Sequence, residues 1–189
     1  MMLPSKWQPN NSVFWDEKSP CLALRTDISS SRVIVFSDNP IPSVESLASF
    51  QSNGESTAAI YYFEIEILSN VNDGGSSEIA IGIAPVDSTH QHDQMHMDTY
   101  NSFRSAIGSV SYSNTGVVTR AGSANPVIRY GSHDVIGCGC EIGGGSEIFF
   151  TCNGKIITEP NIDKGPCCNS VEKNYFPAVE LLGIGTTIR

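Results

Sequence analysis

The residues with the most specific chemistry gather in one polar stretch of the chain. Residues 85–101 show little periodicity, and they hold imidazole and carboxylate groups, both of which bind metal ions. Zinc sites, however, normally take their ligands from well-placed pairs on rigid elements, whereas this stretch is a long polar connection. We therefore expect a solvated acidic loop, with no metal and no other cofactor. The side chains concerned are His90, His92, His96, Asp87, Asp93 and Asp98.

The cysteines are a second source of possible chemistry, but their spacing favours burial. Side chains alternate along a strand, so Cys138 and Cys140 share one face, and Cys152 shares a face with Phe150. Free cysteine often behaves as a small buried hydrophobe. A nucleophilic cysteine needs a nearby base, and the odd spacing of His133 and Cys138 places them on opposite faces. We predict buried cysteines and no catalytic pair. The other cysteines are Cys21, Cys167 and Cys168.

Two further motifs resemble catalytic or binding patterns. Glu64 and Glu66 share a strand face and could act as the paired carboxylates of a glycosidase. Nothing in the sequence places a second carboxylate pair opposite them, and aromatic platforms for a sugar are scarce, so we expect solvent-facing charges. Glycines 143–145 lack the Lys-Ser/Thr and the following helix of a phosphate loop, so we interpret them as a hairpin connection.

The elements that position these groups are predicted to be short strands. Residues 131–140 and 148–152 are two such runs, and the second meets Asn153-Gly154, a strong hairpin signal because both residues tolerate positive φ. Three consecutive antiparallel strands are therefore expected. Residues 61–68 alternate cleanly, which predicts a strand with one buried face, formed by Tyr61, Phe63, Ile65 and Ile67, and one mostly wet face.

Other short apolar runs complete an all-β pattern. Residues 78–84 are expected to be the hairpin partner of 61–68, and residues 107–112 and 116–119 to form another hairpin. Residues 122–130 are interpreted as a polar loop. Further strands are predicted at 22–24, 32–36, 176–182 and 186–189, and a Ser-rich loop at 47–56.

Composition limits the functions that such a fold can have. The chain has 189 residues, enough for one domain, with 40% hydrophobic and 16% charged residues. Its net charge is −9 and no window concentrates Lys or Arg, which argues against nucleic acid and anionic membranes as partners. The amino terminus lacks a signal-peptide pattern. We expect an intracellular protein, cytoplasmic or nuclear, that is a monomer on its own.

Several blocks occur in the order typical of SPRY (B30.2) domains. Pro40-Ile41-Pro42 ahead of the Tyr-Tyr-Phe-Glu strand is most similar to the Ran-binding-protein-M and Ash-two-like branches. The resemblance implies a bent sandwich of two antiparallel sheets, resembling a concanavalin-like jelly roll. It also implies a protein-interaction module, often inside ubiquitin-ligase or chromatin-modifying complexes. The blocks are residues 40–42, 61–67, 81–84, 109–112, 131–138, 148–155 and 175–179.

The chain also departs from the family pattern. The tryptophan common near residues 109–111 is absent, the frequent Gly-Asp-Val-Ile motif reads His-Asp-Val-Ile at 133–136, and the usual closing Asn-Phe-Gly is missing after Arg189. We expect residues 1–19 to be an extended segment that packs its aromatic side chains on the domain. Residues 20–189 are expected to form the SPRY domain, cut short or ending differently at the carboxyl terminus.

The resemblance also indicates where a partner would bind. Loops at one end of a sandwich carry binding residues because the sheets hold them rigidly. By order along the chain, Ser77, Tyr100 and Leu182 match pocket positions of the SOCS-box branch, with Leu182 in place of a common aromatic. Tyrosine and arginine are favoured interface anchors, which adds further candidates. These are Arg104, Tyr112, Arg129 and Tyr130.

The predicted function is therefore a non-catalytic adaptor that binds a short peptide segment of a partner through surface loops. The alternative function is a carbohydrate-binding or glycoside-processing β-sandwich.

Overall fold

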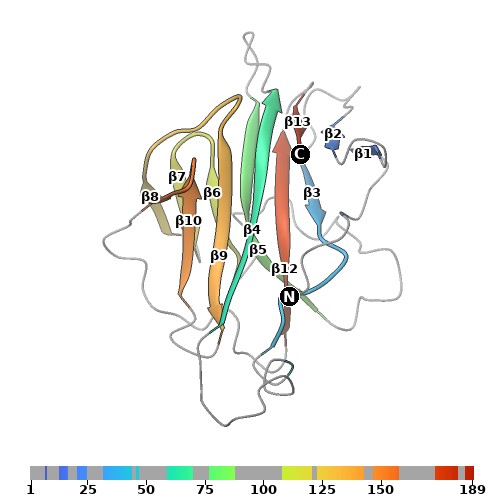
Figure 1. Ribbon diagram of the computed structural model, residues 1–189, viewed down its shortest axis with the longest axis vertical. Helices are drawn as coiled ribbons and strands as arrows, with labels where there is room; N and C mark the ends of the chain where they lie inside the picture. Colours follow the sequence, from blue (N-terminus) through green and yellow to red (C-terminus); the bar gives the residue numbers. More distant parts are fainter. Residues whose placement is uncertain are drawn as a thin grey trace.

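The described part of the chain forms two antiparallel β-sheets that enclose a common hydrophobic core (Figure 1). Every element with assigned bounds in this part is a strand. Among the described residues, no helix is long and apolar enough to cross a membrane. The computed structural model describes residues 7, 13–16, 21–24, 32–43, 46, 59–69, 77–87, 108–120, 123–142, 147–157, 173–182 and 186–189.

The two sheets have seven and six strands among the described residues. The seven-stranded sheet has the order β1 (Val13–Asp16), β2 (Cys21–Leu24), β13 (Thr187–Ile188), β4 (Ala59–Ser69), β9 (Val135–Ile142), β10 (Ile148–Cys152) and β11 (Lys155–Ile157). The six-stranded sheet has the order β3 (Arg32–Phe36), β12 (Lys173–Leu182), β5 (Glu78–Asp87), β6 (Val110–Ser113), β7 (Val117–Arg120) and β8 (Ser123–Pro126). This architecture confirms the predicted all-β sandwich.

The three consecutive strands predicted in the carboxyl-terminal half are present. β9 pairs with β10, and β10 pairs with β11 across a turn in which Asn153 and Gly154 have φ values of 52° and 74°. The Asn153 side chain also accepts a hydrogen bond from Val135 N at 2.9 Å, which ties the turn to β9. The dipeptide thus has the left-handed conformation that its composition indicated. The predicted β6–β7 hairpin is also confirmed.

Two predictions about the strands were wrong. Residues 78–84 are not the hairpin partner of 61–68: β4 pairs with β9 and β13, whereas β5 pairs with β12 and β6 in the other sheet. β4 buries one alternating face, whereas β5 is buried along nearly its whole length, and neither sequence pattern shows which strands become hydrogen-bonded neighbours. Residues 123–126 are β8 rather than a loop, an exposed edge strand where Pro126 is tolerated.

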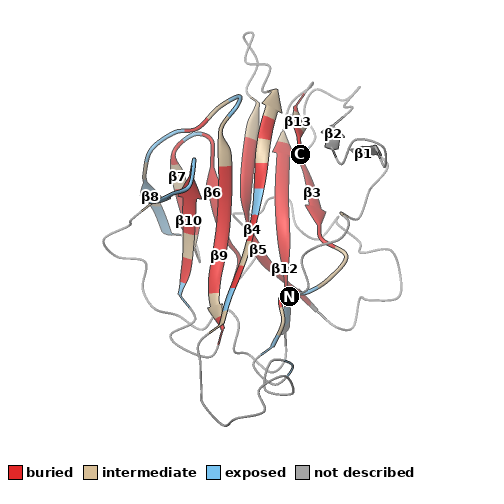
Figure 2. Cartoon of the chain, in the orientation of Figure 1, coloured by how far each residue is buried: buried red, intermediate tan, exposed pale blue. Residues whose placement is uncertain are grey.

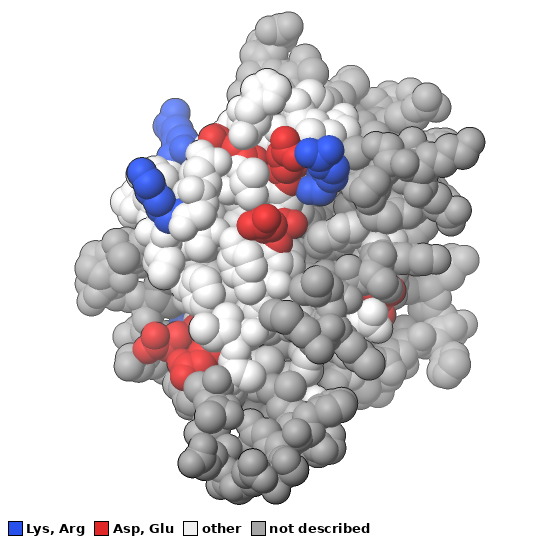
Figure 3. Space-filling model, viewed as in Figure 1, with Lys and Arg blue, Asp and Glu red and all other residues white. Residues whose placement is uncertain are grey.

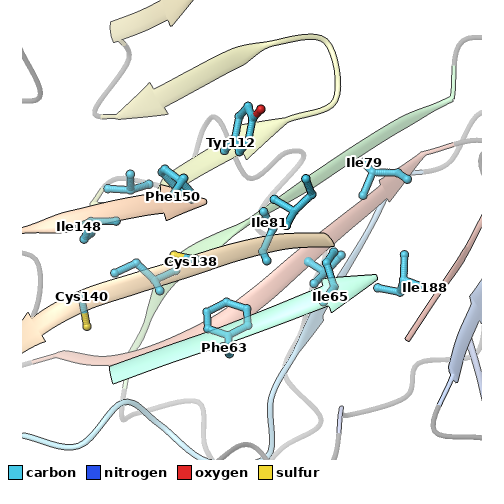
Figure 4. Close-up of a cluster of buried hydrophobic side chains, with 14 of the residues drawn as sticks. Phe63, Ile65, Ile79, Ile81, Tyr112, Cys138, Cys140, Ile148, Phe150 and Ile188 are labelled. Carbon is cyan, nitrogen blue, oxygen red and sulfur yellow. The ribbon is translucent and has the colours of Figure 1, made fainter. Parts of the chain in front are cut away.

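The core lies between the sheets and follows the predicted alternation. Along β4, Tyr61, Phe63, Ile65 and Ile67 are buried and their neighbours are not, as Figure 2 shows by the changing colour of the strand. The cysteines Cys138, Cys140 and Cys152 are buried free thiols, as predicted. Figure 4 shows Cys138 and Cys140 among isoleucine and aromatic side chains from both sheets.

Near the amino terminus, Trp7 contacts this core directly. Trp7 forms an isolated bridge with Ser37, and its ring meets Phe63 edge-on with centroids 6.2 Å apart. β1 pairs with β2 at one edge of the seven-stranded sheet. The described amino-terminal strand is therefore part of that sheet.

Candidate functional site

One end of the six-stranded sheet brings together three of the predicted site residues. β3 and β5 begin at this end and β12 ends there, so that Leu182 lies opposite both Arg32 and Glu78. Ser77 directly precedes β5, and Arg129 lies beside the β6–β7 turn. We call this end the rim and define it by Arg32, Ser77, Asn114, Ile128, Arg129 and Leu182.

A buried asparagine fixes the backbone of the rim. Asn114 accepts a hydrogen bond from Ile79 N at 3.2 Å, and its own backbone N–H donates to Ile79 O at 2.9 Å. Its side-chain amide donates to Ser77 O at 3.3 Å. Since Asn114 follows β6, these bonds hold the start of β5 against the end of β6. Sequence reasoning missed this residue, because its role depends on which strands are neighbours.

Two buried tyrosines support the loop at 127–131. The Tyr112 hydroxyl donates to Ile128 O at 2.8 Å, and the Tyr130 hydroxyl donates to Ile79 O at 2.8 Å and to Tyr112 O at 3.1 Å. The two rings meet edge-on, with centroids 4.8 Å apart. Burial raises the pKa of both hydroxyls above the ordinary value, so they stay protonated donors.

This arrangement corrects the predicted placement of Tyr112 and Tyr130. Both were expected on surface loops as interface anchors, but Tyr112 lies on β6 with no exposed surface, and Tyr130 is also buried. Their rings are large apolar groups whose hydroxyls find carbonyl partners, and that makes burial more favourable than exposure. They position the loop and cannot contact a partner without unfolding it.

The loop presents an apolar and a cationic side chain to solvent. Ile128 is 57% exposed and Arg129 is exposed. The Arg129 stem crosses Gly116, which has φ 78°; a Cβ there would lie 2.9 Å from Arg129 Cγ and 2.7 Å from Val127 O. Sequence reasoning missed Ile128, because its apolar type suggests burial. The structure places it in a segment that is not a strand, where its side chain is exposed.

The other arginine of the rim is already engaged. Arg32 forms ion pairs with Glu180 at 2.5 Å and with Glu78 at 3.2 Å. Burial lowers the pKa of the Arg32 guanidinium, but the hydrogen bond and charge of Glu180, together with Glu78, raise the pKa more, so it ends above its ordinary value. Leu182 is half-buried between β3 and β5, and its aliphatic side chain cannot make the contacts of the aromatic residue common at this position. The rim therefore presents one apolar and one guanidinium group on a hydrogen-bonded base.

Several predicted site residues lie outside the described part of the chain. Tyr100, Arg104 and the three histidines belong to a segment flanked by Asp87 and Gly108. Asp87 ends β5 and Gly108 precedes β6, at the end of the sheet opposite Ser77. Cys167 and Cys168 also lie outside. Among the described residues, no group of three or more His, Cys, Asp or Glu side chains could hold a metal ion.

The carboxylate pair and the three cysteines whose side chains are described have the environments that the sequence predicted. Glu64 is exposed and accepts a hydrogen bond from the Tyr62 hydroxyl at 3.1 Å, and Glu66 forms an ion pair with Arg189. Burial and the charge of Asp134 raise the pKa of the Cys152 thiol above its ordinary value. That shift disfavours the thiolate, the reactive form of cysteine.

Comparisons with known proteins agree with this geometry. The family model of the SPRY domain matches residues 60–182. The crystal structure of the SPRY domain of human HERC1 superimposes with a TM-score of 0.60 at 14% sequence identity, covering 98% of this chain and 94% of that chain. A comparison with curated protein sequences gave no match. At this level of identity the superposition shows a shared fold.

Proposed function

The chain belongs to the SPRY-domain family, and on that premise we propose that it binds a short peptide segment of a partner protein through the rim. SPRY domains are generally non-catalytic protein-interaction modules. In this proposal the protein is an adaptor in a larger intracellular complex, such as a ubiquitin ligase or a chromatin-modifying assembly. The similarity to the Ran-binding-protein-M and Ash-two-like branches is part of the same proposal.

The observation that carries the proposal is the exposed pair Ile128 and Arg129 on a buried, hydrogen-bonded base. Binding residues are most effective when a rigid scaffold holds them, because less conformational freedom is lost on binding. The hydroxyls of Tyr112 and Tyr130 provide that scaffold by bonding to backbone carbonyls. An isoleucine can occupy an apolar contact, and a guanidinium can donate several hydrogen bonds to a carboxylate or to backbone carbonyls.

The test is a quantitative pull-down from native lysate with matched variants. The rim variant is Ile128→Ser/Arg129→Ala, and the control is Lys155→Ala, which removes an exposed cationic side chain of β11 away from the rim. We expect the rim variant to lose specific partner proteins that the wild type and the control both retain. Equal recovery by all three proteins would contradict the rim as the binding surface. Loss of the same partners in both variants would also contradict it.

A further inference from the structure

The outer face of the seven-stranded sheet carries two aromatic rings that lie over two glycines of β9, Gly137 and Gly139. Tyr62 of β4 and Phe149 of β10 lie opposite each other, because each pairs with Gly139 of the intervening β9. Their rings are nearly parallel, with an angle of 12° between planes and 6.2 Å between centroids. Both side chains are half-buried, so the surface of each ring is shared between the protein and solvent.

The glycines of β9 determine how the rings lie. A Cβ on Gly139 would lie 2.3 Å from Phe149 Cζ, and a Cβ on Gly137 would lie 2.1 Å from the Tyr62 hydroxyl oxygen. Both rings therefore occupy the space that side chains of β9 would take. Since their inner sides rest on the backbone, their outer sides form a platform toward solvent. We define the ring platform as Tyr62, Glu64 and Phe149.

A hydrogen-bond chain holds the tyrosine and leaves a carboxylate at its side. The Tyr62 hydroxyl lies 2.8 Å from Thr151 Oγ1 and donates to Glu64 Oε2 at 3.1 Å. Glu64 is exposed, and a carboxylate has about four acceptor positions, of which this bond uses one. A negative group thus stands beside two ring faces, which carry negative quadrupole charge.

The charges around the platform favour a cationic occupant. Figure 3 shows a mostly uncharged area over β4, β9 and β10, with both acidic and basic side chains at its margins. The chain as a whole carries a net charge of −9. The same face already holds one guanidinium, because Arg189 pairs with Glu66, two residues from Glu64 on β4. Guanidinium and ammonium groups bind both carboxylates and aromatic ring faces.

Apolar side chains flank the platform on both sides. Ile60, two residues before Tyr62 on β4, is 59% exposed. Ile156, which lies opposite Thr151 on β11, is 63% exposed. A free sugar would not use these isolated aliphatic groups, whereas a peptide with a basic residue among apolar residues would contact both kinds of group.

We propose that the ring platform is a second binding site, independent of the rim, for an arginine or lysine side chain of an extended peptide segment. The cation would lie over the faces of Tyr62 and Phe149 and pair with Glu64. Apolar residues on either side of it would contact Ile60 and Ile156.

The test starts from a phage-displayed library of random short peptides, selected on the wild-type protein. The binding of each selected peptide is then measured by fluorescence anisotropy on three variants. Glu64→Gln removes only an exposed charge and should leave the fold intact, and Phe149→Leu keeps apolar bulk but removes a ring. The rim variant Ile128→Ser/Arg129→Ala is the control.

We expect a class of selected peptides that contain Arg or Lys and keep their affinity for the rim variant. Glu64→Gln should weaken this class about fivefold at low salt, the size of one exposed ion pair, and Phe149→Leu by a similar factor. Raising the salt concentration should weaken binding to the wild type and have little effect on Glu64→Gln.

Three results would overturn the platform site. The first is that no selected peptide depends on Glu64 or Phe149, and the second is that the dependent peptides lack a basic residue. The third is that methyl glycosides, rather than basic peptides, shift the ring resonances of Tyr62 and Phe149 in NMR spectra. A peptide that loses affinity only for the rim variant, and not for Glu64→Gln or Phe149→Leu, would support binding at the rim and contradict binding of that peptide at the ring platform.

Discussion

The outer faces of the two sheets have opposite characters. On the six-stranded sheet, the outer face of β3, β12 and β5 is apolar and buried, and it includes Glu180, which is only 2% exposed. On the seven-stranded sheet, the outer face of β4, β9 and β10 carries exposed carboxylates, isoleucines and two half-buried rings on glycines. The members of the buried outer cluster are Ile34, Phe36, Ala84, Val86, Phe176 and Ala178.

This contrast indicates how the molecule separates stability from recognition. The β12 strand is buried on both faces and reads as a nearly continuous apolar run, as expected for a strand inside a layered structure. The β4 strand alternates, which leaves one of its faces for solvent and for ligands.

The largest expected difference is between Gly82 and Gly139, a glycine from each sheet. A Cβ at Gly82 would lie 1.9 Å from Val110 O, a backbone atom that cannot move aside without disturbing β6. The neighbour of Gly139 is instead the tip of the Phe149 ring, which can rotate away. We expect Gly82→Ala to reduce the free energy of unfolding by about 3 kcal/mol and Gly139→Ala by about 1 kcal/mol or less.

Urea denaturation measures both effects. Gly131, where a Cβ would have no atom within 4 Å, provides the matched control substitution Gly131→Ala. Equal destabilisation by Gly82→Ala and Gly139→Ala would show that the described packing around these glycines is wrong.

The second comparison concerns the ion pairs on the two outer faces. Arg32→Met would remove the ion pair that Arg32 forms with buried Glu180, and we expect a loss of about 2 kcal/mol in stability, below the full value for a buried pair because Arg32 is 32% exposed. Glu66→Gln breaks the exposed ion pair with Arg189, and we expect it to lower the free energy of unfolding by about 0.5 kcal/mol. Thermal unfolding at low and high salt measures both effects. Only the stability difference between wild type and Glu66→Gln should become smaller at high salt, because salt screens exposed charges.

The smallest comparison sets two buried tyrosines of the core against each other. Tyr130→Phe leaves the carbonyls of Ile79 and Tyr112 without this donor, and we expect a destabilisation of about 1–2 kcal/mol. The Tyr61 hydroxyl is buried and has no hydrogen-bond partner among the described residues, so Tyr61→Phe should be neutral or slightly stabilising. Denaturant titration of both variants measures their free energies of unfolding. A larger loss of stability for Tyr61→Phe than for Tyr130→Phe would contradict the described contacts.

Burial of Tyr130 also predicts a pH dependence. Its pKa in the folded state is raised by desolvation well above that of an unfolded chain, so folding holds the proton more tightly. This contribution to stability is complete below about pH 10 and is lost as the pH rises from there through the raised pKa. The wild type should therefore lose more stability than Tyr130→Phe as the pH rises above about 10, by up to about 1.4 kcal/mol per pH unit. Parallel curves for the two proteins would contradict this.

The elements with a clear local signal could be predicted from sequence. The alternation of β4, the Asn153-Gly154 turn and the burial of Cys138 all follow from period-two side-chain geometry or from turn chemistry, which involve only neighbouring residues. The strands that pair with β5 could not be predicted. A short connection from β4 to β5 has the same sequence pattern whether the two strands are neighbours in one sheet or belong to two sheets. β8 was missed because an exposed edge strand has no apolar face to reveal it.

For the candidate site, the sequence predicted chemistry but not exposure. It correctly indicated that Ser77 and Leu182 lie near strand ends, and the structure brings both to the end of the sheet that also carries Arg129. It misplaced Tyr112 and Tyr130, since residue type alone does not show whether a tyrosine hydroxyl will meet water or a buried carbonyl. Ile128 was missed for the complementary reason, because its apolar type suggests burial.

The amino-acid sequence by itself determined the class of fold and its family, because strand periodicity, turn dipeptides and block order are properties of residues close along the chain. The tertiary structure alone decided which faces are covered, which hydroxyls are buried and which rings lie on glycines. Those properties depend on contacts between strands far apart in sequence, such as Tyr62 and Thr151, and no local pattern encodes such a contact.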